Sequence, residues 1–523
     1  MELKVAIIKT TIRQYMKVLF FYPYFGFNLT AKTFFGILLI IAYNSSMAEV
    51  IFDSSLAQSK QPITLSSPNY IIHPVYGVQK GVNLFHSFDK FSLDKGEKAT
   101  FRTDASIQNI IARITGGEQS FINGTIATEA SSPANLWMIN PAGWLFGEHA
   151  ALDVKGSFHI SSADAVTLGD GQQFFSDLSK QSSLSVAPPL GYEFTQPSSA
   201  AITLDNSLLN IQEGKTISLI GGDVNINNSQ INSPVGNILI ASNDRPGSWE
   251  LTATGLQHNN QLLGDINITR QQENVAFSDG SLNISDPNSL NSGGLIQLTA
   301  NNTMLDNTDI VAISFGNTQG GTVQFINSAD LNFKNKSSIR TDVYDNGTGG
   351  NVFIEADNLT IQGSSDIRSD TDRSAFNSTG GSIVIQLKNK LIISDNGSEI
   401  ASFSQTSGVG GNVNIEANKI VIKNLASINT DTQHKANAGA IIINANNISL
   451  ETGGTISSAT SDIANFEDSK IKAGEGGEIA IQAQSLSVTG EGTLISSASF
   501  ANGGAGGNIS IQTNTLNVSN TAE

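Results

Sequence analysis

The segment GGNVFIEADNLTIQGSSDIRSD, residues 349–370, contains the pattern that decides the fold of this chain. Apolar residues recur at every second position in it, at Val352, Ile354 and Ala356, and this period of two is typical of a β-strand that is buried on one side. Breaks at Asp357–Asn358 and Gly363–Ser365 predict corners between strands. The segment is therefore predicted to form one coil of three short strands.

The same pattern returns through the second half of the chain. A second copy, GGNVNIEANKIVIKNLASINTD, occupies residues 410–431. A period of about thirty residues is typical of stacked repeats, in which each unit packs on the next. The Gly-Gly dipeptides that mark the units begin at residues 293, 320, 349, 380, 410, 476 and 506.

Three features depart from the regular repeat. A degenerate unit occurs at Ala438-Gly439, and the polar insertion SDIANFEDSKIKAGE at residues 461–475 is expected to form a loop on one face. The repeats run up to Glu523 without a polar cap. We therefore expect this end either to continue into further coils or to associate with another surface.

A single coil of this kind is too small to fold alone. Burial of its apolar side chains contributes roughly 10–20 kcal/mol, whereas ordering its backbone costs roughly 30–60 kcal/mol. Stacked coils can hydrogen-bond in parallel and align their inward Val, Ile and Leu side chains, so the sequence predicts an all-β, single-stranded parallel β-helix. Glycine pairs are expected at a tight corner. The asparagines that follow them, Asn351, Asn412 and Asn508, are expected to stack into an amide ladder.

The composition indicates a β-rich protein whose negative charge disfavours the binding of polyanions. The chain has 523 residues, of which 14% are charged and 49 are glycine, and its formal net charge is −17. This charge should repel nucleic acids and anionic membrane surfaces, so no nucleic-acid partner is expected. The chain contains no cysteine, which excludes disulfides and leaves it free of covalent crosslinks.

The first 48 residues have the features of an export signal. A basic stretch precedes the apolar run FFGILLIIAY at residues 34–43, and Ser46-Met47-Ala48 supplies small residues before a cleavage site. The run is short for a membrane span. We therefore predict a signal peptide at residues 1–48 and no stable membrane span after its cleavage, with a retained membrane anchor as the alternative.

The N-terminal third does not repeat, and its motifs resemble those of a known family. The segments that carry the resemblance are NLFHSFDKFSLDKGE (83–97), NIIARITGGEQSFINGTI (109–126), ANLWMINPAGWLFGEHAALDVKGSFHISSAD (134–164), PPLGYEF (188–194) and GKTISLIGGDVNINNSQINSPVGNILIAS (214–242). In order and spacing they are similar to the filamentous-haemagglutinin-type secretion domain of two-partner secretion exoproteins.

This resemblance implies a right-handed β-helix with a capped N-terminal end. It also implies export by a dedicated outer-membrane barrel, the two-partner secretion transporter, whose periplasmic domains recognise the segment. The protein would then be secreted, or held on the outer cell surface, after crossing the periplasm of a Gram-negative-type envelope. The predicted organisation is a signal peptide (1–48), the secretion domain (49–190), a β-helical continuation with a loop insertion (191–290) and the Gly-Gly repeats (291–523).

One short motif carries part of the resemblance. Asn140, Pro141 and Gly143 match the family's Asn-Pro-Asn-Gly-Ile motif, whereas Ala142 and Trp144 depart from it. The match implies a role in recognition by the transporter. Local chemistry alone also explains the motif as a structural turn, because Asn begins turns, Pro fixes φ and Gly accepts positive φ. Both interpretations remain open at this stage.

No catalytic, metal-binding or cofactor-binding residues are predicted. The histidines show neither an HxxxH nor an HExxH spacing, and without cysteine a zinc site is not expected. The sequence contains no GxSxG elbow and no calcium-binding GGxGxD repeat. We therefore expect no cofactor, no metal and no enzymatic activity. The histidines are His73, His86, His149, His159, His258 and His434.

A charged pattern recurs in the repeats. The segments SSIRTD and SDIRSD fall in the same register, one repeat apart. Because the alternation points isoleucine inward, Arg340 and Arg368 are expected to stack outside, as are Asp342 and Asp370. The pattern predicts a surface ladder in which Arg and Asp of adjacent coils neutralise one another. The alternatives are a glycan-binding stripe, since acids and arginines so placed could hold a sugar chain, and a catalytic site.

These observations predict an exported exoprotein that works as an adhesin or a surface-structural rod. Its receptor would be a surface glycan or a protein. One alternative is a secreted β-helical carbohydrate-active enzyme, which would need acids and basic groups converging in a deep groove. The other is a haem- or haemoprotein-binding exoprotein, for which the sequence shows no histidine pair or aromatic pocket.

Overall fold

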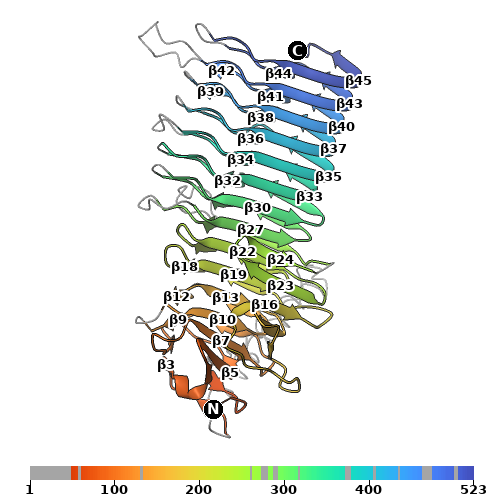
Figure 1. Cartoon of the computed structure of the whole chain (residues 1–523). Helices are drawn as coiled ribbons and strands as arrows, with labels where there is room; N and C mark the ends of the chain where they lie inside the picture. The colour runs from red at the N-terminus through yellow and green to blue at the C-terminus, as the bar shows by residue number, and fades with distance from the viewer. Residues whose placement is uncertain are drawn as a thin grey trace, which may run out of the picture. The chain divides into compact units, whose positions relative to one another are not determined.

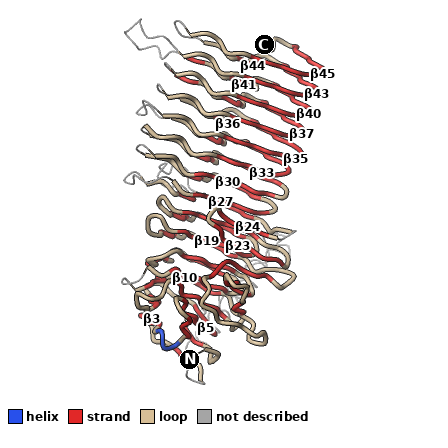
Figure 2. The backbone as a smooth tube through the Cα atoms, viewed as in Figure 1, coloured by secondary structure: helices blue, strands red, loops and turns tan. Residues whose placement is uncertain are grey.

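Parallel strands, stacked coil upon coil, form most of the computed structural model of this chain (Figure 1). The structure describes residues 49–523 apart from 57–60, 130–132, 260–261, 272–280, 287–292, 316–317, 345, 372–377, 405–407, 434–435, 462–473 and 500–503. The predicted signal peptide, its membrane-anchor alternative and most of the predicted loop at 461–475 lie outside the described residues. Among the described elements, only the 3-10 turn η1 (Pro74–Tyr76) is helical, so the all-β prediction is confirmed (Figure 2).

One column of strands extends through every coil, and each strand pairs in parallel with the next. Its inward residues form rows, such as Val323, Val352 and Ile383, which are in register and fully buried. The predicted parallel β-helix is therefore confirmed. The column consists of β5 (Asn83–Phe91), β7 (Asn109–Ile114), β10 (Asn135–Ile139), β13 (Phe158–Ser161), β19 (Thr216–Gly221), β22 (Asn237–Ser242), β27 (Leu295–Ala300), β30 (Thr322–Asn327), β33 (Val352–Ile361), β35 (Ile383–Ser394), β37 (Val413–Lys423), β40 (Ile441–Glu451), β43 (Ile479–Thr489) and β45 (Ile509–Ser519).

Two further columns complete the coils. The second consists of β8 (Ser120–Ile122), β11 (Trp144–Phe146), β17 (Ile202–Asp205), β20 (Val224–Asn227), β25 (Ile266–Thr269), β28 (Thr303–Asp306) and β31 (Asp330–Lys334). The third begins with the sheet of β3 (Asn69–Ile72), β6 (Lys98–Phe101), β9 (Thr125–Thr128) and β12 (Ala151–Asp153). It continues as β18 (Leu208–Asn210), β21 (Gln230–Asn232), β26 (Leu282–Asn283), β29 (Asp309–Val311), β32 (Ser338–Arg340), β34 (Asp366–Arg368), β36 (Glu399–Ala401), β38 (Ser427–Asn429), β41 (Thr455–Ser457) and β44 (Leu494–Ser496), beside the short pair β39 (Thr432–Gln433) and β42 (Thr460–Ser461).

The predicted three strands per coil hold only up to β31. From β33 onward the strands of the first two columns are joined into one long strand. The predicted corner at Asp357–Asn358 is therefore a bend inside β33, where the pairing register shifts between Ala356 and Asn358. The pattern marked the right position, but the backbone bends there without leaving the sheet.

The glycine pairs lie at a corner where neighbouring coils approach closely, as predicted. A Cβ atom built on Gly350 would lie 1.9 Å from the carbonyl oxygen of Gly321, and one on Gly381 would lie 1.9 Å from that of Gly350. The spacing of the coils thus excludes any side chain at the second glycine of the pair. The degenerate unit keeps this second glycine, Gly439, although Ala438 replaces the first.

The prediction of an amide ladder after the glycine pairs is wrong. The side-chain oxygen of Asn351 accepts a hydrogen bond from the backbone N–H of Ser382 (3.0 Å), and that of Asn412 accepts one from Ala440 (2.9 Å). Ser382, Ala440 and Glu478 occupy the intervening coils, so successive asparagines lie two or three coils apart and cannot meet. A ladder forms instead between the asparagines that begin β5, β7 and β10, with bonds of 3.0 and 3.2 Å.

Antiparallel additions distinguish the N-terminal part. β1 (Val50–Phe52) and β4 (Val78–Lys80) pair with β5, the first strand of the main column, and β2 (Ile63–Thr64) pairs with β1. A separate sheet contains β14 (Ala165–Leu168), β15 (Gln173–Phe175), β16 (Pro189–Phe194), β23 (Gly247–Thr252) and β24 (Gly255–His258). It shares a second apolar cluster with the main column, to which Phe85, Trp137 and Trp249 belong. β16 spans residue 190, the predicted end of the secretion domain.

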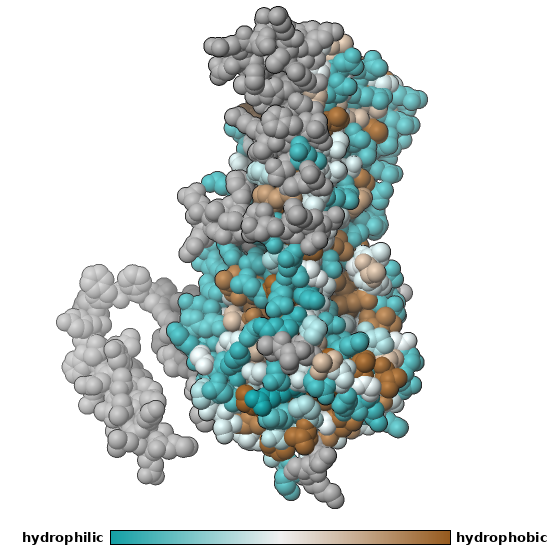
Figure 3. All heavy atoms as spheres, turned by 60° about the vertical axis from the view of Figure 1, so that its left-hand side comes forward, coloured by the Kyte–Doolittle hydropathy of each residue, from teal (hydrophilic) through white to brown (hydrophobic). Residues whose placement is uncertain are grey.

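Apolar side chains are also visible from outside. On the face drawn in Figure 3, hydrophobic residues lie between hydrophilic ones, and they are more frequent in the lower half, which is the N-terminal part in Figure 1. On β45, the residues in register with the inward rows are exposed: Ile509, Ile511, Leu516 and Val518.

Candidate functional site

Asn140 begins a tight turn between β10 and β11. Its side chain is fully buried, and its amide nitrogen donates to the carbonyl oxygen of Glu118 and to Ser120 Oγ, both at 2.9 Å. Its side-chain oxygen accepts from the N–H of Ala142 (3.0 Å). All of these contacts are internal, so they support the interpretation of Asn140 as a structural residue.

The rest of the motif shapes the same turn. Gly143 has φ of +90°, and a Cβ atom there would lie 2.6 Å from the carbonyl oxygen of Ala201. Pro141 and Ala142 are half-buried and form the accessible part of the turn. A transporter that recognises this turn would therefore have to contact Pro141 and the backbone rather than the buried Asn140 side chain.

The two arginines of the charged pattern stack in register, as the sequence indicated, but the aspartates do not lie outside. Arg340 on β32 is opposite Arg368 on β34. The side chains of Asp342 and Asp370 are only 3% and 6% exposed. Arg340 is mostly buried as well, since it leaves 14% of its side chain exposed. The predicted surface ladder is therefore a largely buried cluster.

The buried aspartates hold the backbone of the next coil. Asp342 Oδ1 accepts a hydrogen bond from the N–H of Asp370 (2.9 Å), and Asp370 Oδ1 accepts one from the N–H of Phe403 (2.7 Å). The Nε of Arg340 donates to Asp342 Oδ2 at 2.7 Å. Both aspartates follow the end of a short strand, where the chain turns inward, and strand alternation no longer applies. A sugar chain cannot reach these carboxylates without breaking such bonds.

Arg368 joins the cluster to the following coil. It forms ion pairs with Asp366 (3.6 Å), Asp370 (3.4 Å) and Glu399, to which its Nη2 also donates a hydrogen bond. This engagement favours the interpretation of mutually neutralising charges. The glycan-binding stripe at Arg340, Asp342, Arg368 and Asp370 stays a prediction.

Burial dominates the electrostatics of this cluster. It raises the pKa of Asp366 to about 6, against an opposing effect of the Arg368 charge. Burial also raises the pKa of Asp370, and the neighbouring Asp342 carboxylate adds to the rise. A carboxyl group whose pKa is raised by folding contributes stability below its unfolded pKa, and this contribution is lost as the pH rises through the folded value. For Asp366 that window runs from the ordinary value of 3.8 to about 6.

The variant Asp366→Asn is therefore expected to remove a pH-dependent penalty. At pH 8 its free energy of unfolding should exceed that of the wild type by about 1–3 kcal/mol, because each unit of pKa shift corresponds to about 1.4 kcal/mol. At pH 4, where the wild-type carboxyl group in the folded protein is protonated, the two proteins should differ little. Urea unfolding followed by circular dichroism at both pH values measures this. If the free energies of unfolding of the two proteins change in parallel from pH 4 to pH 8, ionisation of Asp366 does not destabilise the folded protein and the prediction is wrong.

The described residues offer no obvious metal centre. Within them, no group of three or more His, Asp or Glu side chains is placed to hold a metal ion. His86 and His159 are buried, and burial lowers the pKa of each to about 3, so both are neutral at ordinary pH. His434 lies outside the described residues.

Comparison with known proteins identifies the N-terminal half. The family model of the TPS secretion domain matches residues 48–298, which extends past the predicted end of that domain at residue 190. The crystal structure of the HMW1 secretion domain from Haemophilus influenzae is similar, with 14% identity and a TM-score of 0.45, covering 87% of this chain and 96% of that one. No curated protein sequence matches the chain.

The chain thus contains the secretion domain of a two-partner secretion exoprotein, which confirms the resemblance noted in the sequence. This domain indicates export by a two-partner secretion system and interaction with its outer-membrane transporter. The implied destination is the cell surface or the extracellular space. In the described part of the chain, no helix has the length and apolar character needed to cross a bilayer.

Proposed function

We propose that a dedicated outer-membrane transporter exports this chain by recognising its N-terminal domain through periplasmic domains, and that the exported β-helix works as an adhesin or a surface-structural rod. The TPS secretion domain at residues 48–298 carries the export part of this proposal. The stacked coils beyond it support the second part, because a repeat array presents long, regular faces to a partner.

The order of strand pairing supports a simple way of folding outside the cell. Antiparallel β1 and β4 pair with β5, so new coils add in sequence order on the other side of that strand. Each added coil gains parallel hydrogen bonds to the previous one, and its inward residues extend the apolar rows. Coils that form outside would therefore oppose back-sliding of the chain.

The carbohydrate-active enzyme is less well supported than the adhesin. Catalysis would need acids and basic groups that converge in a groove and are accessible to substrate. The aspartates beside Arg340 and Arg368 instead bind backbone N–H groups and arginines inside the coils. No observation on the described residues favours haem binding.

The turn at Asn140 provides the test of transporter recognition. We expect Pro141→Ala to reduce the amount of protein released into the medium about tenfold, measured in the cells that make it together with its transporter. The free energy of unfolding of the purified protein should fall by only about 1 kcal/mol or less, since the substitution mainly restores chain entropy to the unfolded state. Asn140→Ala should reduce secretion as well, but it also costs about 1–3 kcal/mol of stability through lost buried hydrogen bonds.

Asn243→Ala is the matched control for Asn140→Ala. Asn243 is also fully buried in this domain, and its amide donates to Ser199 Oγ (3.1 Å) and to the carbonyl oxygen of Arg245 (2.8 Å). It should lose similar stability with a smaller loss of secretion. If the two variants lose secretion in proportion to stability and Pro141→Ala is secreted normally, the motif is a structural turn only.

A further inference from the structure

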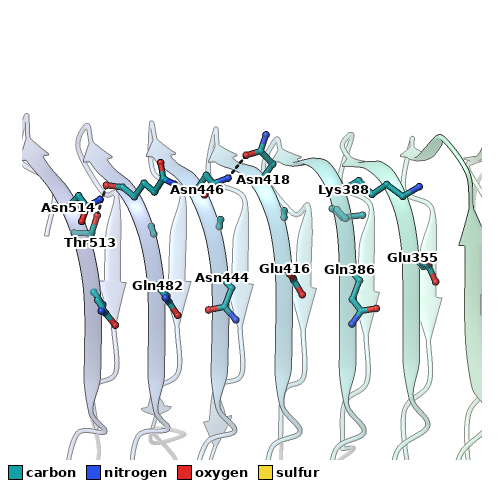
Figure 4. A pocket seen from close by; sticks show the side chains of 16 residues that line it. Glu355, Gln386, Lys388, Glu416, Asn418, Asn444, Asn446, Gln482, Thr513 and Asn514 are labelled. Atoms are coloured by element: carbon teal, nitrogen blue, oxygen red, sulfur yellow. Dashed lines mark hydrogen bonds between the residues drawn. The ribbon is translucent and has the colours of Figure 1, made fainter.

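A long groove lies on the outside of the coils from β33 to β45. It has a volume of about 1010 Å³ and follows the bend in the long strands (Figure 4). Its floor contains Leu387 and small residues, Ala417, Ala445 and Ala483. Because every coil bends at the same register, the groove runs along the stacking direction rather than along any strand.

One wall of the groove is a row of polar side chains, with one residue from each coil. The row is in register across the sheet and consists of Glu355, Gln386, Glu416, Asn444, Gln482 and Gln512. Figure 4 shows Glu355 to Gln482 at equivalent positions on successive strands. Neighbouring strands lie about 4.8 Å apart, so the row repeats at that distance and spans about 24 Å.

The amides of this row are available for a ligand. All six side chains are exposed, and among the described residues no hydrogen bond joins the side chains of Gln386, Asn444, Gln482 and Gln512 to the protein. Other amides of the chain bond to one another from coil to coil, as Asn446 does with Asn418 on the opposite wall (2.7 Å). An amide offers both donors and an acceptor, which suits hydroxyl and acetamido groups.

The charges in the groove and the apolar side chains beside it indicate which class of ligand can bind there. The groove contains Glu355, Glu416 and Lys388, and the lysine is paired with Asp357 at 2.9 Å, so a polyanion would meet two carboxylates without a free cation. Two positions before the polar row, Phe353 and Ile442 are exposed by 40% and 41% on the same outward face. They provide apolar surface on which the C–H face of a sugar ring can rest.

We propose that this groove binds a linear, uncharged polysaccharide that lies along the stacking axis, with one sugar unit facing each coil. The spacing is the decisive argument. About 4.8 Å between coils is close to the length of one pyranose unit in an extended chain, so successive amides can meet hydroxyl or acetamido groups of successive units. An extended peptide advances about 3.3 Å per residue and would lose register with the row. The inference rests on the proposed role as an adhesin and assigns it a ligand class and a site.

Binding of defined oligosaccharides to the purified protein tests this inference. Cello-oligosaccharides and chito-oligosaccharides of two to six sugar units serve as probes, and a heparin fragment serves as the polyanionic comparison. We expect affinity to rise with length up to the longest uncharged probe in at least one series, and heparin not to bind. In Asn444→Ala/Gln482→Ala the affinity for the longest probe should fall about tenfold, which corresponds to about 1.4 kcal/mol.

A matched control uses the same two strands outside the groove. Ser449→Ala/Ser487→Ala changes outward residues that are in register with each other on β40 and β43 and do not line the groove. It should bind like the wild type, and both double variants should keep their unfolding midpoints. If the wild type binds neither oligosaccharide series, binds an extended peptide instead, or binds sugar equally well without the two amides, the inference is wrong.

Adhesion to cells separates this inference from the proposed function. If wild type and groove variant adhere equally to cells, the adhesin proposal stands and the groove assignment fails. If the wild type adheres to no surface, the adhesin proposal fails whatever the oligosaccharides do. Release of shorter sugars from the probes would contradict a purely binding role for the groove and favour the enzyme alternative.

Discussion

Gly381→Ala is expected to destabilise the β-helix by about 3 kcal/mol. A Cβ atom at this position would lie 1.9 Å from the carbonyl oxygen of Gly350 and 2.6 Å from Ser369 Oγ. Ser369 Oγ donates to the Gly350 oxygen (2.9 Å) and accepts from the Gly381 N–H (2.9 Å), so the obstructing atoms are fixed by hydrogen bonds. The coils would have to separate to admit the methyl group, and overpacking of this kind typically costs about 1–3 kcal/mol, occasionally more.

The measurement is urea unfolding of the purified protein, with circular dichroism and limited proteolysis as independent probes, because repeat arrays need not unfold in one step. Gly169→Ala is the control. A Cβ atom at Gly169 would have its nearest neighbour, the carbonyl oxygen of Pro188, at 3.5 Å, and this glycine does not adopt positive φ. It should change stability by less than about 0.5 kcal/mol. Equal losses in the two variants would mean that close approach of the coils does not require the glycine column.

The regular part of the fold could be predicted because one local rule repeats. Alternation in residues 352–356 identifies the inward rows, and the glycine pairs identify the corner where the coils touch. The rule fails where the chain turns. After Ile339 and Ile367, a buried Thr341 or Ser369 donates a hydrogen bond to the Gly350 carbonyl oxygen, and the following aspartate is buried too. The recurrence of Ser or Thr two residues after the inward isoleucine was the signal that could have located this inward turn.

The repeat pattern predicts neither the groove nor the additional sheet, and the reasons differ. Glu355, Gln386 and Asn444 occupy equivalent positions of the repeat, so the row itself is visible in the sequence. The groove exists only because β33 and its successors bend at Ala356 and equivalent positions instead of ending there. A strand that bends and a strand that ends show the same alternation of residues, so the sequence does not distinguish them. The sheet from β14 to β24 depends on antiparallel pairing between segments far apart in sequence, such as Tyr192 with Trp249, which no local pattern specifies.

Arg113 ties this additional sheet to the N-terminal strands. It lies on β7, is only 4% exposed, and donates to Ser87 Oγ on β5 (2.8 Å), Ser55 Oγ after β1 (3.0 Å) and Ser182 Oγ (3.0 Å). It also donates to the carbonyl oxygen of Phe175 on β15 and lies over the ring of Phe174, 4.4 Å from its centre. One guanidinium thus joins three parts of the secretion domain.

The carboxylate of Asp53 is the counter-charge of Arg113, and the hydroxyl groups of Ser55 and Ser87 form hydrogen bonds to both. Asp53 accepts from Ser55 Oγ (2.5 Å), Ser87 Oγ (2.5 Å) and Thr115 Oγ1 (2.8 Å). Burial alone would raise the pKa of Asp53, but these hydrogen bonds outweigh it and hold the pKa below its ordinary value. Burial lowers the pKa of Arg113 to about 10, against the opposing charge of Asp53, so both groups are charged near pH 7.

Arg113→Met should therefore cost about 3–5 kcal/mol, because it leaves the buried Asp53 carboxylate without its counter-charge and removes the donor from three serine hydroxyl groups. Urea unfolding at pH 7 measures the loss, and proteolysis should cut the segment between β15 and β16 sooner than in the wild type. Arg102→Met is the control. Arg102 is half-exposed and forms a long ion pair with Glu129 (3.9 Å), so its loss should cost less than about 1 kcal/mol. In Arg113→Met/Asp53→Asn the loss should be smaller than the sum of the single losses, because the second change removes the unpaired charge. Additive losses would show that Arg113 acts through packing on Phe174 and not through Asp53.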